Sequence, residues 1–111
     1  MIRILALAIA ACLIWPTPFQ SAEASTRRGR IIAERQCAPC HSIERTGKSP
    51  LENAPPLRTI AAKYPLENLE EAFAEGIMVT HKGQQMPVFE MAPQTIADVI
   101  DFLKSLRPKR K

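Results

Sequence analysis

The stretch Cys37-Ala38-Pro39-Cys40-His41 reads C-x-x-C-H, the spacing at which a chain attaches a c-type haem. Two thiols at this spacing can each form a thioether bond to one vinyl group of a haem, and the imidazole that follows can bind the iron. We therefore predict that Cys37 and Cys40 hold one haem c covalently and that His41 is an axial ligand of the iron. The haem then performs the redox chemistry, while the protein sets its exposure and potential.

The N-terminal segment has the pattern of an export signal. Arg3 is followed by an uninterrupted apolar run over residues 4–15, which is shorter than the ~20 residues of a membrane span. The stretch Ser21-Ala22-Glu23-Ala24 then supplies an A-x-A cleavage signal. We expect cleavage after Ala24, so that residues 1–24 are a cleaved secretion signal and residues 25–111 form one periplasmic domain with no membrane span.

A second processing route is open at Cys12. The stretch Ile9-Ala10-Ala11-Cys12 resembles a bacterial lipobox, which would place a lipid on Cys12. The apolar run continues through residues 13–15, so the segment before Cys12 is short for the apolar part of such a signal. We therefore favour ordinary export over lipid anchoring.

Composition is consistent with a small domain built around a cofactor. The chain has 111 residues, of which 5% are aromatic, so its own apolar core is thin and a buried haem would enlarge it. Basic residues are concentrated at 27–30 and 107–111; they are either solvated termini or a docking surface for acidic partners, and we favour solvated termini. No aromatic residues alternate with these charges, which argues against binding to nucleic acid.

Helical patterns separated by Pro- and Gly-bearing loops predict an all-α domain with no convincing strand. The expected helices cover approximately residues 27–37, 59–63, 65–74 and 93–107. Ser25 or Thr26 can cap the first of them, and Gly76 lies near the end of the third. The last helix has an apolar stripe at positions i, i+3, i+4, i+7 and i+10, namely Ile96, Val99, Ile100, Leu103 and Leu106.

A six-coordinate iron needs a second axial ligand, and Met86 is our prediction for it. Met86 lies in an expected loop and is followed by Pro87, whose fixed φ would stiffen the approach of the sulfur. A thioether favours reduced iron and raises the potential. His81 and Met91 are the rival ligands, an open iron site is a further possibility, and Met78 has the surroundings of a core residue.

These residues together resemble the small class I, monohaem cytochromes c of bacteria, over nearly all of the chain that follows the signal. The C-x-x-C-H is one shared motif, and Met86-Pro87-Val88-Phe89 resembles the family's M-P-x-F ligand loop. Ala54-Pro55-Pro56-Leu57 resembles its G-P-x-L loop, and Ile100-Asp101-Phe102-Leu103 matches its closing I-x-[YF]-L. Gly29 lies eight residues before the first cysteine, where the family keeps a glycine.

The resemblance assigns roles to several of these residues. It implies that the Pro55 carbonyl accepts a hydrogen bond from His41, that Phe89 shapes the methionine loop, and that Phe102 meets Gly29 where the first and last helices cross. Two positions depart from the family pattern: Ala33 stands where an aromatic is frequent, and Ala54 replaces the glycine of G-P-x-L. The two terminal helices are therefore expected to pack differently, without effect on the iron.

The resemblance implies about four helices and Pro/Gly loops wrapped around one haem. It also implies a monomeric electron carrier, not an enzyme, that serves redox proteins as donors and acceptors. A haem c subunit or accessory domain of a larger exported oxidoreductase would have the same fold and stays open as an alternative. A thiol–disulfide protein using Cys37 and Cys40 would need a βαβ context, which the sequence lacks. A peroxidase or gas sensor would need an open iron site and so requires that Met86 does not bind.

Overall fold

The computed structural model describes residues 21–76, 80–81 and 84–109, and within them the domain is all-α, as predicted. Its helices and strands are α1 (Ala22–Gln36), α2 (Leu57–Lys63), α3 (Leu66–Glu75), β1 (Thr80–His81), β2 (Gln84–Gln85) and α4 (Pro93–Ser105). None of the described helices combines the length and the apolar character needed to cross a membrane. The export segment over residues 1–20, with Cys12, lies outside the described residues, as do Arg110 and Lys111.

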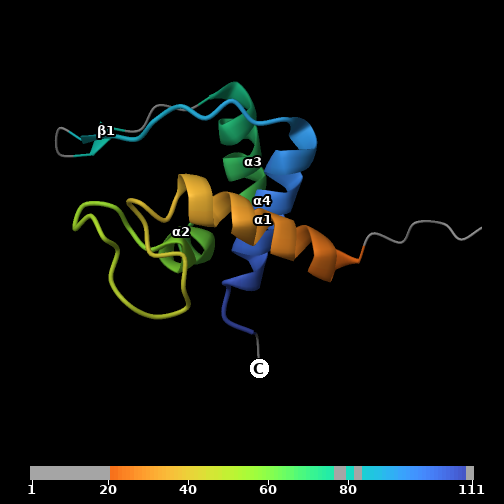
Figure 1. The fold of residues 1–111 in the computed structure, drawn as a ribbon, viewed down its shortest axis with the longest axis horizontal. Coiled ribbons are helices and arrows are strands. Elements are labelled where there is room, and N and C mark those ends of the chain that lie inside the picture. The colour runs from red at the N-terminus through yellow and green to blue at the C-terminus, as the bar shows by residue number, and fades with distance from the viewer. Residues whose placement is uncertain (1–20, 77–79, 82–83, 110–111) are drawn as a thin grey trace, which may run out of the picture.

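The fold is organised by the crossing of α1 over α4 (Figure 1). Gly29 is buried at this crossing, and a Cβ placed on it would overlap with the backbone carbonyl of Asp98 and lie 2.9 Å from Cβ of Phe102. This confirms the expected meeting of Gly29 and Phe102. Ala33, one turn further along α1, is 0% exposed, so the small residue in place of an aromatic lets the helices stay close.

An ion pair completes the crossing. The Arg28 guanidinium donates from Nε and Nη2 to the two carboxylate oxygens of Asp98, at 2.8 and 2.9 Å. Asp98 lies in α4 and its side chain is only 7% exposed, whereas Arg28 is 40% exposed. The sequence analysis did not identify this pair, because the two residues are far apart in the chain.

The apolar stripe of α4 forms the centre of the core, as its spacing predicted. All five of its residues are buried, and the rest of the core comes from Phe102 on the same helix, from the other helices and from the segment after His41. The remaining buried apolar residues are Ala33, Ile43, Leu57, Ala61, Leu66 and Phe102. Burial of one face of each helix is the main source of stability in such a domain.

The first helix begins earlier than predicted. Ser21 is its N-cap, accepting a hydrogen bond from the Ala24 amide, and Ser25 and Thr26 instead donate their hydroxyls to the Ala22 carbonyl inside the helix. The prediction of a cap at Ser25 or Thr26 is therefore wrong for the full chain. Ala22 to Ala24 are good helix formers with an acidic residue in the first turn, and they extend the helix upstream.

The other helices follow the prediction within two residues. The second begins at Leu57, because that residue is buried against the core, and the third ends at Gly76, whose φ of 72° is the left-handed conformation of a helix C-cap. Where only a loop was expected, β1 and β2 pair antiparallel with Thr80 opposite Gln85. A ladder two residues long has no room for an alternating pattern, so the sequence carried no signal for it.

Candidate functional site

Helix α1 delivers the two thiols to one place. Cys37 is its C-cap, with its amide donating to the Ala33 carbonyl, and residues 37–40 form a turn. The amides of Cys40 and His41 both donate to the Cys37 carbonyl, at 3.1 and 2.8 Å. Both thiols are free and half-buried, so one turn of backbone presents two cysteines and a histidine together.

The environment of Cys37 does not suit thiol exchange. Burial, with a smaller contribution in the same direction from the neighbouring Cys40, raises the pKa of the Cys37 thiol to about 11. A thiol with a raised pKa is protonated at neutral pH, whereas disulfide exchange requires the thiolate. The chemistry of the site therefore disfavours a thiol–disulfide protein.

The His41 ring is anchored by the residue that the resemblance pointed to. Its Nδ1 lies 2.6 Å from the carbonyl oxygen of Pro55. A carbonyl only accepts, so Nδ1 is the donor of this hydrogen bond, and in a neutral ring with that tautomer Nε2 has the lone pair. An imidazole held in this tautomer is prepared to bind a metal through Nε2.

The loop between His41 and α2 is held in shape by Arg58, which the sequence analysis missed. This side chain donates from its guanidinium to the carbonyls of Glu44 and Gly47, at 3.2 and 2.7 Å. The Leu57 amide also donates to the Ser42 carbonyl, at 2.9 Å. Together these bonds close the loop that positions the Pro55 carbonyl, and a lone arginine just after two prolines gave no sequence signal for this role.

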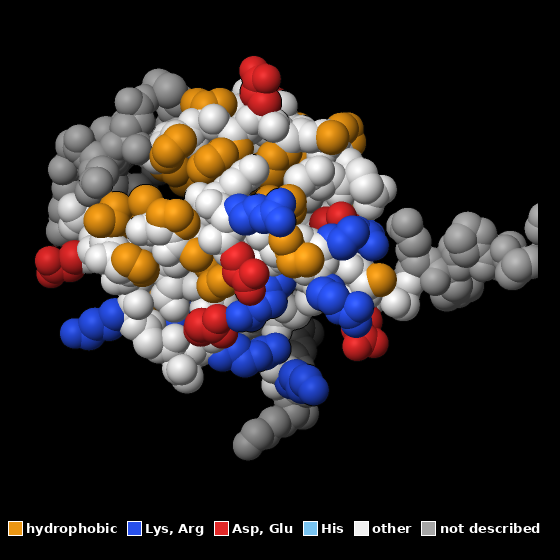
Figure 2. Space-filling view, viewed as in Figure 1, with side chains coloured by type: hydrophobic (Ala, Val, Ile, Leu, Met, Phe, Trp, Pro, Cys, Tyr) orange, Lys and Arg blue, Asp and Glu red, His pale blue; other side chains and the backbone are white. Residues whose placement is uncertain are grey.

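Apolar side chains from several elements pack against the buried core and stay only partly covered. They come from α1, the turn after it, α2, α3 and the segment before α4, and they are Ile32, Ala38, Ile60, Leu69, Phe73 and Met91. On the face drawn in Figure 2, hydrophobic side chains gather over the upper and left part of the molecule, and Lys and Arg over α1 and the lower end of α4. Two thiols and an imidazole on one turn of backbone fit a covalently bound haem.

The second predicted ligand lies in an extended segment that follows β2. Met86 and Phe89 are half-buried there, Pro87 and Val88 are exposed, and Met91 packs against the core. Met78 and the side chain of His81 lie outside the described residues. Met86 therefore remains a prediction as the iron ligand.

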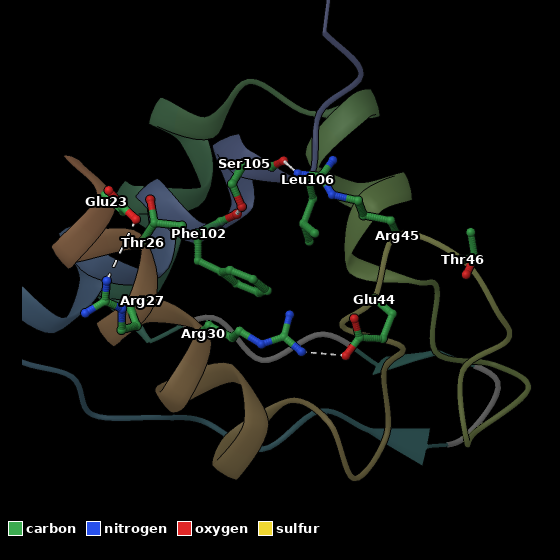
Figure 3. A pocket seen from close by; sticks show the side chains of 10 residues that line it. All are labelled: Glu23, Thr26, Arg27, Arg30, Glu44, Arg45, Thr46, Phe102, Ser105 and Leu106. Atoms are coloured by element: carbon green, nitrogen blue, oxygen red, sulfur yellow. Dashed lines mark hydrogen bonds and ion pairs between the residues drawn. The ribbon is translucent and has the colours of Figure 1, made fainter.

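A hollow on another part of the molecule has a different character. It measures about 620 Å³ and lies between the first turns of α1, the end of α4 and residues 44–46 (Figure 3). Its arginines are engaged: Arg30 pairs with Glu44, and Arg45 donates to the Ser105 carbonyl. Neither thiol of the C-x-x-C-H turn lines this hollow, and His41 does not line it either, so it is not the site of the haem-binding motif.

Comparison with known proteins agrees with this geometry. A protein-family model described as Cytochrome c matches residues 26–107, which is most of the chain. The match begins within α1 and ends just after α4, so it includes both helices of the crossing and the C-x-x-C-H turn. No curated protein and no solved structure gave a match.

Proposed function

We propose that this chain, which belongs to the cytochrome c family and binds covalently attached haem c, is a periplasmic monohaem carrier with His/Met-ligated iron. The family consists of electron carriers, so haem-based transfer of electrons between redox partners is its activity. The observation that supports ligation by His41 is the 2.6 Å contact between its Nδ1 and the Pro55 carbonyl. It leaves Nε2 as the ring nitrogen for the iron, whereas ligation by Met86 rests on the resemblance of its loop to the family's ligand loop.

In this proposal each of four residues has one task. Cys37 and Cys40 would provide the two thioether bonds, and His41, through Nε2, and Met86 would be the two iron ligands. When bound, the haem supplies the one-electron redox couple of its iron. Since a thioether favours reduced iron, Met86 sets a higher potential than a second histidine would.

The protein's contribution is to keep the histidine still. The Pro55 carbonyl accepts the Nδ1 proton, which orients the ring and makes Nε2 more electron-rich. The backbone amide of His41 donates to the Cys37 carbonyl at 2.8 Å, so the backbone of this residue is held in place as well as its ring. A ligand restrained in this way moves little when the charge of the iron changes, which suits repeated one-electron transfer.

Replacement of Met86 tests the ligation directly. The oxidised wild-type protein should show the weak sulfur–iron charge-transfer band at the red end of the visible spectrum, and Met86→Ala should lose it. A redox titration should show a lower potential for the variant. Met91→Ala is the matched control and should keep the band, because Met91 packs against the core. Survival of the band in Met86→Ala would refute the assignment.

The proposed location rests on the N-terminal pattern. Cleavage after Ala24 would remove the first turn of α1 and leave Ser25 at the new terminus, close to the helix start that the sequence predicted. Mass spectrometry of the protein recovered from an exporting host should give a monomer that begins at Ser25. A lipid on an N-terminal Cys12 would contradict this location and indicate a membrane-anchored carrier.

A further inference from the structure

Helix α3 carries an unbalanced negative charge. It has four glutamates, all exposed, and no basic residue: Glu67, Glu70, Glu71 and Glu75. Glu67 and Glu71 are four residues apart, as are Glu71 and Glu75, so like charges are neighbours on one helix face, which costs about 0.2–0.5 kcal/mol for each pair. Glu75 also lies at the C-terminal end, where the helix dipole favours a cation.

These carboxylates find no opposite charge within the described part of the domain. None of the ion pairs among the described residues involves a glutamate of α3; the pairs lie on α1, α4 and the loop after His41. Exposed carboxylates without an internal partner are available to an opposite charge on another molecule.

A groove of mixed character lies at the end of this helix. It measures about 460 Å³ and is formed by the end of α3 and residues 88–92, with Phe73, Val88, Phe89 and Met91 in its lining. Glu75 and Glu90 stand at the same groove, and both are exposed. Val88 is 45% exposed, and Gly76 lies so close to it that an added Cβ would be 3.1 Å from Val88 Cγ1. The groove thus brings exposed carboxylates and apolar side chains together on one surface.

We propose that this groove and the glutamates of α3 form the docking surface for a redox partner that presents a basic face with an apolar centre. The proposal rests on the proposed function, because the groove is built from the segment that follows the predicted ligand Met86. Charge complementarity selects the partner: a basic face would relieve the repulsion along α3, whereas an acidic face would add to it. No basic residue of α1 lines this groove, so the proposal does not require them.

The test is a titration of the isotope-labelled, haem-loaded protein with short peptides, followed by nuclear magnetic resonance at low and at high salt. The basic probe alternates lysine and leucine, and the control probe alternates glutamate and leucine. We expect the basic probe to shift the amide signals of residues 70–76 and 88–92, and high salt to weaken its binding. The acidic probe should bind at least tenfold more weakly.

Variants assign the binding to this surface. Each Glu→Gln change should weaken binding about twofold, so Glu70→Gln/Glu71→Gln/Glu75→Gln together should weaken it roughly eightfold. The same variant should be as stable as the wild type or more so, because like-charge repulsion is removed. Glu52→Gln is the matched control: it removes one exposed carboxylate from the loop before Pro55 and should leave binding unchanged.

A second pair of variants tests the contribution of the apolar side chains of the groove. Val88→Ser should weaken binding, whereas Ile31→Ser, which changes a comparably exposed apolar residue on α1, should not. Unchanged binding by the triple glutamine variant, or equal binding of the acidic probe, would overturn the proposal. So would concentration-dependent shifts of α1 and α3 signals in the protein alone, which would show that a second copy covers the surface. The charge-transfer band of the same samples reports Met86 ligation independently, so failure of docking and failure of the ligand assignment are distinguishable.

Discussion

Replacing Gly29 with alanine tests how closely α1 and α4 cross. In an open helix this change would stabilise the protein by about 1 kcal/mol, because alanine loses less backbone entropy on folding. At Gly29 the new methyl would overlap with the Asp98 carbonyl and lie 2.9 Å from Cβ of Phe102. Those atoms belong to the buried side of α4 and do not swing aside as a flexible side chain does. Overpacking at the upper end of its usual range costs about 3 kcal/mol, which leaves a net loss of about 2 kcal/mol.

The assay is urea unfolding of the haem-loaded protein followed by far-ultraviolet circular dichroism. The urea concentration at the unfolding midpoint should fall. The slope of the free energy of unfolding against urea concentration should stay the same, because the surface area exposed on unfolding changes little. Gly47→Ala is an informative control: Gly47 has φ of 91° and no atom within 4 Å of an added Cβ. It should lose about 1 kcal/mol through backbone strain alone, and Gly47→Asn should recover part of that. Wild-type or greater stability of Gly29→Ala would refute the close crossing.

Two further predictions concern residues that the sequence analysis missed. The hydrogen bond from Arg28 holds the pKa of the Asp98 carboxyl below its ordinary value, so this pair stabilises the fold above the unfolded-state pKa and loses that effect as the pH falls through the folded-state pKa. Asp98→Asn should therefore lower the free energy of unfolding by a constant amount near neutral pH and by less below about pH 5. A difference in unfolding free energy between wild type and variant that does not vary with pH would contradict this. Arg58→Gln should remove about 1 kcal/mol of local stability and speed amide exchange of residues 42–47 about fivefold. Exchange in α4 should stay unchanged, and equal acceleration in both segments would indicate a global effect.

The sequence alone was sufficient where the information is local. The C-x-x-C-H turn is five consecutive residues, and its spacing predicts covalent haem without any knowledge of the fold. The stripe of α4 is similarly local, because helical periodicity shows which face is buried. The motif resemblance also pointed to Pro55 and to the meeting of Gly29 and Phe102, since each has a fixed place relative to a recognisable pattern.

Tertiary structure decided what depends on pairs distant in the chain. The bidentate bond between Arg28 and Asp98 joins two helices, and the bonds of Arg58 close a loop, yet each arginine in the sequence resembles any exposed cation. The start of α1 was also misplaced, because a cap depends on which serine the folded backbone leaves outside the helix. The glutamates of α3 are visible in the sequence, but only the fold brings Glu75 beside Val88 and Glu90 at one groove. Periodicity and motifs determine which elements form and which cofactor they hold, whereas electrostatic partners and docking surfaces arise only when distant segments come into contact.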